Sequence, residues 1–192
     1  MKDKLSKYSL EKLAEMIRNE SKNSNFAFAE IYSRLSENLY LFICKLTGDS
    51  EEASDIFQET FISFHKYLSK NSVNNVSSFI FKIARNLFLN TKRINEKTVP
   101  YNEEMKQDEA DEIVEQISEY DTELYKKILN EALDTLDFKY KEVFVMRYYL
   151  DLDYEKIAML TDMDVNTLKT RVYRAKNLIR EHIEKYYKEI ID

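Results

Sequence analysis

Basic and hydrogen-bonding side chains share one face of a helix predicted near the C-terminus. From Leu168 to Arg180 there are five basic residues and no acidic one. The side chains on this face and along its edges are Asn166, Lys169, Thr170, Arg171, Tyr173, Arg174 and Lys176. Lys and Arg suit guanine edges and phosphates, while Asn and Thr adapt to either. This face therefore predicts a helix that enters the major groove of DNA.

Two helices joined by a short break position that face. Asp153 is placed to cap the first helix and Asp164 to cap the second, with a break at residues 161–163 of the length that a helix-turn-helix has. The inward stripe of the second helix is Val165, Leu168, Val172 and Ala175. A solvated face of a bundle helix is the alternative interpretation. The two caps, the break and the unbroken basic face together favour DNA binding.

Composition predicts a soluble, all-α protein. The 192 residues include one Gly and one Pro, and helix-period segments run through most of the chain. No stretch approaches 18 uncharged apolar residues and no apolar signal core opens the chain, so we expect a cytoplasmic protein without membrane insertion. His65 and His182 are far apart, and no residue grouping is typical of a metal site, a phosphate-binding glycine loop or a catalytic triad. We expect no metal, no cofactor and no enzymatic activity.

The net charge of −6 is concentrated in one segment. Residues 96–123 carry eleven acidic and two basic side chains, whereas residues 1–95 are net basic. We expect two small helical domains, at 26–95 and 124–192, joined by the acidic linker 96–123 and preceded by an N-terminal extension, 1–25. The spacing of Leu10, Leu13 and Ile17 predicts an amphipathic helix in the extension, with no role assigned to it.

The first domain is predicted to carry an acidic face and a basic face on different helices. Gly48 ends one helix, Asp49 or Ser50 caps the next, and segment 69–78 is a polar loop. The acidic face, on the helix before the loop, includes Asp55, Gln58 and Glu59. The basic face, on the helix after the loop, includes Lys82, Arg85, Asn86, Lys92 and Arg93. The inward stripe of the basic helix is predicted to be Phe79, Ile83, Ala84, Leu87, Thr91 and Ile94.

Three blocks of the sequence resemble the extracytoplasmic-function (ECF) sigma factors, the two-domain initiation factors of bacterial RNA polymerase. The first block is Asp-x-x-Gln-Glu-x-Phe, from Asp55 to Phe61. The second is Ile-Ala-Arg-Asn at 83–86, followed by Arg93. The third is the segment 133–183, which contains the helix-turn-helix. Their order and separations make the resemblance specific, and the linker is too short for the middle domain of housekeeping sigma factors.

The resemblance implies that the first domain binds core polymerase and opens the −10 element. The face with Asp55, Gln58 and Glu59 would contact the clamp helices of the largest subunit. Arg85 and Asn86 would meet the −10 strand. The phosphate contacts would come from Lys82, Lys92 and Arg93. The loop would hold a base flipped from the stack, because reading a single strand by its bases requires unstacked bases.

The resemblance also implies that the second domain reads the −35 duplex. Lys169, Thr170, Tyr173 and Arg174 would make the contacts, with Asn166, Arg171 and Lys176 nearby. Further partners implied by the family are the polymerase flap region and an anti-sigma factor. The acidic linker is expected to run through the basic RNA-exit path of polymerase.

At four positions the chain departs from the family pattern. One of them is Asn90, where the family usually has Asp. Phe79 stands where the family usually has Trp, and an aromatic ring can still pack there. Asp162 stands at the turn where the family usually has Gly, and Asp tolerates left-handed backbone geometry better than most residues. Asp137 replaces a common Pro before a helix. None of these changes removes a predicted DNA-contacting group.

Two other functions remain open from the sequence. A free-standing helix-turn-helix regulator would explain residues 153–180 but would leave the acidic face and the Ile-Ala-Arg-Asn helix without a use. A sigma-like interaction protein that titrates a partner would not need intact basic faces.

Overall fold

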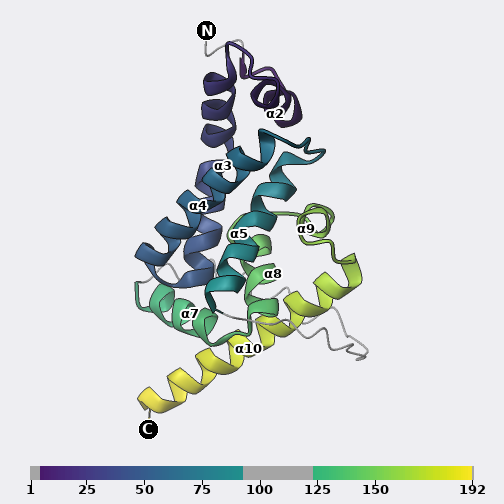
Figure 1. The fold of residues 1–192 in the computed structure, drawn as a ribbon. Coiled ribbons are helices and arrows are strands. Elements are labelled where there is room, and N and C mark those ends of the chain that lie inside the picture. Colours follow the sequence, from purple (N-terminus) through teal and green to yellow (C-terminus); the bar gives the residue numbers. More distant parts are fainter. Residues whose placement is uncertain (1–4, 93–122, 192) are drawn as a thin grey trace. The chain divides into compact units, whose positions relative to one another are not determined.

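The chain folds into helices that divide between two compact units. The computed structural model describes residues 5–92 and 123–191, and their regular secondary structure is helical, which confirms the predicted all-α class. One unit consists mainly of the helices up to Lys92, and the other consists mainly of those from Glu123 onward (Figure 1). Arg93 and nearly all of the acidic linker, including its expected path, lie outside the described residues.

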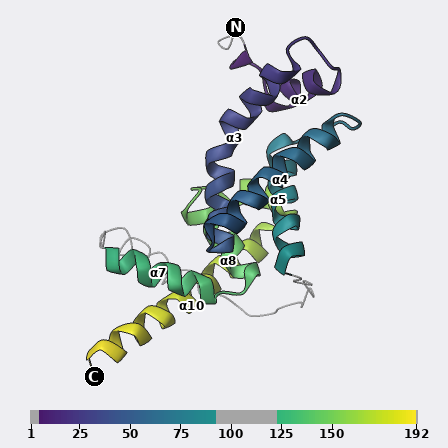
Figure 2. The ribbon, with the colours of Figure 1, turned by 60° about the vertical axis from the view of Figure 1, so that its left-hand side comes forward.

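Within the described residues, four helices build the first unit. They are α2 (Leu10–Arg18), α3 (Ser24–Thr47), α4 (Ser50–Leu68) and α5 (Val76–Lys92). Helices α3, α4 and α5 pack against one another, and α2 lies mainly against α3 (Figures 1 and 2). The helix predicted in the N-terminal extension is therefore confirmed, and it packs as part of this unit. Its buried side chains are Leu13, Ala14 and Ile17.

Capping residues set the ends of the helices in the first unit. Gly48 adopts the left-handed conformation, with φ of 70°, and its N–H bonds the carbonyl of Cys44. The Asp49 side chain then accepts a hydrogen bond from the N–H of Glu52 at 2.8 Å, so α4 starts where the sequence predicted. Asn75 caps α5 in the same way through Ser78, at 2.9 Å. The loop is thus 69–75, three residues shorter than predicted.

The predicted inward stripe of α5 was wrong in register except at Ala84, which is buried as predicted. Ile94, also predicted to face inward, lies outside the described residues. The buried residues are Val76, Ile80, Phe81, Ala84 and Phe88. Phe79, Ile83 and Leu87 are only partly buried, and Thr91 is exposed. The two stripes differ by one residue, because this helix is apolar around much of its circumference and periodicity alone cannot choose between adjacent rows.

The second unit is built around one long helix. Its elements are α7 (Glu123–Thr135), α8 (Phe138–Tyr148), α9 (Tyr154–Thr161) and α10 (Val165–Ile191). Helices α7 and α8 both pack against α10. The core that joins them consists of Ala132, Leu133, Leu136, Phe144, Ala175 and Ile179. Asp137, which replaces the usual Pro before α8, has φ of −54°, a value that proline itself would adopt.

The turn of the helix-turn-helix uses a left-handed aspartate. Asp162 has φ of 58°, as predicted for a residue in place of Gly. Asp and Asn tolerate this region because their short polar side chains can hydrogen-bond locally. The break between α9 and α10 therefore forms a left-handed turn without a glycine.

Candidate nucleic-acid and polymerase interfaces

Asp164 fixes the start of α10 and so orients its basic face. The side chain accepts a hydrogen bond from the backbone N–H of Thr167 at 2.9 Å and another from the Thr167 hydroxyl. Both hydrogen bonds lower the pKa of the Asp164 carboxyl, and the bond from the Thr167 hydroxyl has the larger effect. Asp153 caps α9 through the N–H of Lys156, at 2.7 Å. Both predicted caps are confirmed.

Six of the seven predicted DNA-facing residues on α10 are at least partly accessible. Asn166 is exposed, and the partly buried ones are Lys169, Thr170, Arg171, Tyr173 and Arg174. The Lys169 ammonium lies 5.9 Å from the centre of the Tyr154 ring on α9. This contact holds the lysine beside the turn of the motif without burying its charge. A duplex meeting this face would find several cationic side chains within two turns of helix.

Lys176 does not share this exposure. It is 4% exposed, and its ammonium lies 5.2 Å from the centre of the Tyr148 ring on α8. The residue follows Val172 by one turn of helix and is adjacent to the buried Ala175, so it belongs to the edge of the inward stripe. The prediction that Lys176 lies near the DNA-facing residues is therefore corrected. Its spacing of four from Val172 was the signal in the sequence.

The basic helix α5 exposes most of its predicted polar residues. Lys82, Asn86 and Lys92 are exposed, and Arg85 is partly buried. The Lys92 ammonium lies 2.7 Å from Glu52 Oε2, and the Thr91 hydroxyl donates to Glu52 Oε1 at 3.1 Å. The last turn of α5 is thereby joined to the first turn of α4. The sequence predicts Lys92 on the basic face, but helical periodicity does not reveal its contact with Glu52.

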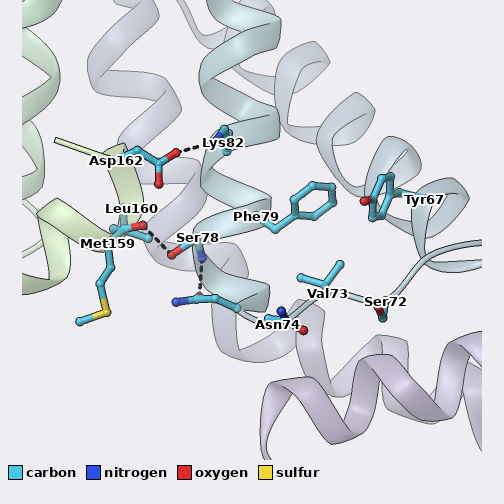
Figure 3. A pocket seen from close by; sticks show the side chains of 11 residues that line it. Tyr67, Ser72, Val73, Asn74, Ser78, Phe79, Lys82, Met159, Leu160 and Asp162 are labelled. Atoms are coloured by element: carbon cyan, nitrogen blue, oxygen red, sulfur yellow. Dashed lines mark hydrogen bonds and ion pairs between the residues drawn. The ribbon is translucent and has the colours of Figure 1, made fainter.

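The loop 69–75 is bordered by aromatic rings. Phe79, at the start of α5, lies with its ring centre 4.4 Å from that of Tyr67, at the end of α4. Figure 3 shows these two rings facing each other, with Val73 of the loop beside them. The loop's polar side chains are exposed, including those of Ser72 and Asn74. An aromatic flank and exposed amides are suited to stacking and hydrogen bonding of an unstacked base.

The outer face of α4 is acidic with one apolar residue. Asp55, Gln58 and Glu59 are exposed, and the Ser63 hydroxyl donates to Glu59 at 3.0 Å. Ile62, 46% exposed, lies one turn after these residues on the same side of the helix. Ile62 was not among the residues predicted for this face, although its spacing of seven from Asp55 indicates that position. Such a surface offers a partner both charge and an apolar contact.

Neither a metal cluster nor a membrane helix emerges in the part of the chain that the structure describes. Within residues 5–92 and 123–191, His, Cys, Asp and Glu side chains do not gather in groups of three that could hold a metal ion. None of the helices in those residues combines the length and apolarity needed to cross a bilayer.

Two family models match separate segments of the chain. The model for sigma-70 region 2 matches residues 31–98, and the model for sigma-70 region 4 matches residues 126–179. The chain is 32% identical over 154 residues to the RNA polymerase sigma factor SigV of Bacillus subtilis, which covers 78% of this chain and 86% of SigV. The chain is an ECF sigma factor of the sigma-70 family. It is therefore an alternative sigma factor that directs transcription initiation.

Further relatives agree with this assignment. The sigma factor is 26% identical over 183 residues to the ECF RNA polymerase sigma factor SigW of Bacillus subtilis, covering 89% of this chain and 96% of SigW. The solved structure of CnrH in complex with the cytosolic domain of CnrY has a TM-score of 0.65 at 14% identity, covering 92% of this chain and 99% of CnrH. At that identity, the likeness concerns the fold alone. Helix α2 lies outside the segment that matches region 2.

Proposed function

We propose that the two units divide promoter recognition between them. The first unit, which contains the region 2 match, binds core polymerase and opens the −10 element, while the second reads the −35 duplex. The observation that carries this proposal is the placement of the charged faces: an exposed acidic face on α4, a basic face on α5 and a capped basic helix, α10. Since region 2 and region 4 are both present, a free-standing regulator has no support.

The polymerase contact is assigned to α4. Asp55, Gln58 and Glu59 project into solvent and suit basic side chains on the clamp helices of the largest subunit. Ile62 extends the same face with an apolar side chain. Apolar side chains that lose their water in an interface contribute much of its binding energy, and charged neighbours add specificity. The flap region of polymerase is the proposed partner of the second unit.

The −10 contact is assigned to α5 and the loop before it. Arg85 and Asn86 meet the melted strand, and Lys82 and Lys92 hold phosphates. Arg93 shares that role and lies outside the described residues. A flipped base would enter beside the loop 69–75, where Phe79 and Tyr67 offer aromatic surface.

The −35 contact is assigned to α10. Lys169, Arg171 and Arg174 supply cationic groups, while Asn166, Thr170 and Tyr173 supply hydrogen-bonding groups and an aromatic ring. Lys176 does not contact DNA in this proposal; it is buried and supports the position of α10 by packing against Tyr148 of α8.

An anti-sigma factor is a further proposed partner. One solved structure similar to this chain is described as the sigma factor RpoE in complex with the anti-sigma factor NepR from Bartonella quintana, with a TM-score of 0.58 at 18% identity, covering 82% of this chain and 96% of RpoE. We also propose that the protein acts in the cytoplasm, where polymerase and chromosomal DNA are found. It contributes binding there, and polymerase supplies the catalysis.

In vitro transcription tests the proposal. Purified protein and bacterial core polymerase are incubated with fragmented genomic DNA of the source organism. Transcripts that begin only when the protein is present are expected, and their upstream sequences should share two spaced elements. Absence of such transcripts, with no co-elution of protein and core enzyme, would overturn the division of labour.

A further inference from the structure

Helix α2 is firmly attached to the first unit although it lies outside the segment that matches region 2. The guanidinium of Arg34 on α3 donates hydrogen bonds to the carbonyls of Leu5, Ser6 and Tyr8, at 3.1, 2.8 and 2.8 Å. It also pairs with Glu30 at 2.8 Å. These bonds fix the chain just before α2, whose apolar side is buried. Helix α2 is therefore held in place by the hydrogen bonds of Arg34 just before its N-terminus and by the packing of its buried apolar side.

The outer part of α2 faces the back of the loop 69–75. A hollow of about 160 Å³ lies between them. Its lining includes Glu11, Glu15 and Arg18 from α2 and Asn71, Ser72 and Val73 from the loop. The loop is thus bordered by an element distant in sequence, on the side away from the ring of Phe79.

One residue of α2 reaches the junction between the loop and α5. Glu11 Oε1 accepts a hydrogen bond from the backbone N–H of Val76, with an N–O distance of 3.4 Å. Because Val76 is the first residue of α5, its N–H has no acceptor within the helix. Val76 is also fully buried. A carboxylate at this end also interacts favourably with the helix dipole. Glu11 and Asn75 therefore accept hydrogen bonds from two of the first N–H groups of α5, those of Val76 and Ser78.

We propose that Glu11 is a positioning residue for reading the −10 element. By holding Val76, it sets where the loop ends and α5 begins, and so fixes the loop beside Phe79. This inference rests on the proposed function of the loop. Glu11 itself does not contact DNA; it acts through the backbone of Val76.

The test measures how well holoenzyme discriminates between −10 sequences. Full-length protein is assembled with core polymerase, and its binding to single-stranded −10 oligonucleotides is followed by fluorescence anisotropy. The oligonucleotides carry either the −10 element of a promoter identified by in vitro transcription or that element with a substitution at each base in turn. Glu11→Ala should reduce discrimination at one base about fivefold, within the range expected for losing a helix cap. Glu11→Gln keeps a carbonyl acceptor and should retain most of the discrimination.

A matched control is Glu15→Ala. Glu15 lines the same hollow and carries the same charge, but its carboxylate pairs with Lys12 at 2.8 Å. This variant should leave discrimination unchanged, and all three variants should bind core polymerase as the wild type does. Equal discrimination in Glu11→Ala and wild type would overturn the inference. If the wild type itself did not discriminate, the proposed function of the loop would fail instead.

Removing the N–H of Val76, the donor in this hydrogen bond, provides a second test of the role of Glu11. Val76→Pro removes the N–H at a position where proline is well tolerated in helices. In that background Glu11→Ala should have no further effect on discrimination, because the bond is already absent. Amide exchange of residues 69–79 in the free protein gives a readout without DNA: it should rise about fivefold in Glu11→Ala and stay unchanged in Glu15→Ala. Additive effects of the two substitutions, or unchanged exchange, would contradict a role for this bond.

Discussion

Glu52 on α4 and Lys92 on α5 form an ion pair, with Oε2 and Nζ 2.7 Å apart. The two residues belong to helices with different proposed partners, since we propose that α4 binds polymerase and that α5 binds the −10 strand. The pair places an acidic group against a lysine that would otherwise be available to a phosphate. Lys92 is exposed and Glu52 is only partly buried, so water still screens the pair and it contributes little to stability, about 0.5 kcal/mol.

Glu52→Gln should strengthen binding of holoenzyme to single-stranded −10 DNA about two- to threefold at low salt. The reason is that Lys92 then loses a competing carboxylate, and the salt dependence of binding should steepen. Anisotropy titrations at several salt concentrations measure both effects. Glu51→Gln removes the same charge from the exposed neighbouring residue and serves as the control. Equal effects of the two substitutions would show that only the overall charge matters.

Replacing both Lys169 and Arg174 with Ala should abolish recognition of the −35 element. Each residue that contacts a base contributes about 1–3 kcal/mol of discrimination, and a phosphate contact contributes a sequence-independent term. Binding to core polymerase should stay intact because neither residue lies on α4. Promoter binding is measured by footprinting, and core binding by co-elution. Loss of core binding in this variant would show that the DNA and polymerase faces have been exchanged.

Lys176→Ala should act on stability and leave DNA contacts in place. The substitution removes the packing of the lysine stem and the contact with Tyr148, which together are worth about 1–2 kcal/mol. Thermal unfolding monitored by circular dichroism measures the loss. Lys176→Met keeps most of the apolar volume and should recover part of the stability. A wild-type melting temperature combined with weaker −35 binding would return Lys176 to the DNA face.

The sequence predicted those features that depend on local chemistry. The caps Asp49, Asp153 and Asp164 could be predicted because an aspartate just before a helix accepts a hydrogen bond from an N–H of the first turn. The left-handed conformations of Gly48 and Asp162 follow from the few residue types that tolerate it.

Features that depend on packing were harder to predict. Helix α5 has adjacent apolar rows, so its register required knowledge of how α3 and α4 cover it. Lys176 is buried although the basic residues around it predict an exposed position. The contacts Glu52–Lys92 and Glu11–Val76 join residues 40 and 65 positions apart. Periodicity within one helix carries no information about such pairs.

Asp55→Arg combined with Glu59→Arg should release core polymerase. The substitutions replace two exposed carboxylates by cations, which would meet like charges on the proposed partner. Because both side chains are exposed, the circular dichroism spectrum and melting temperature should change little. Ile62→Ala should weaken core binding by about 1 kcal/mol or more if the residue is buried in the interface. Glu51→Arg, which changes charge on the first turn of α4, is the control. Retained co-elution of the Asp55/Glu59 variant with core enzyme would exclude α4 as the polymerase face.

Asp164 should give the second unit a stability that decreases in acid. Hydrogen bonds from Thr167 hold the pKa of its carboxyl below the ordinary value of 3.8, so the folded state binds the proton less readily than the unfolded state. The contribution is fully present above pH 3.8 and is lost as the pH falls through the lower, folded-state pKa.

Asp164→Asn keeps a good capping residue but removes the titration, and it should unfold with a shallower dependence on pH below 4. Asp164→Ala should be less stable than both at pH 7, because the N–H of Thr167 loses its acceptor. Urea unfolding between pH 2.5 and 7 measures these differences, and parallel pH profiles for wild type and Asp164→Asn would contradict a titrating cap.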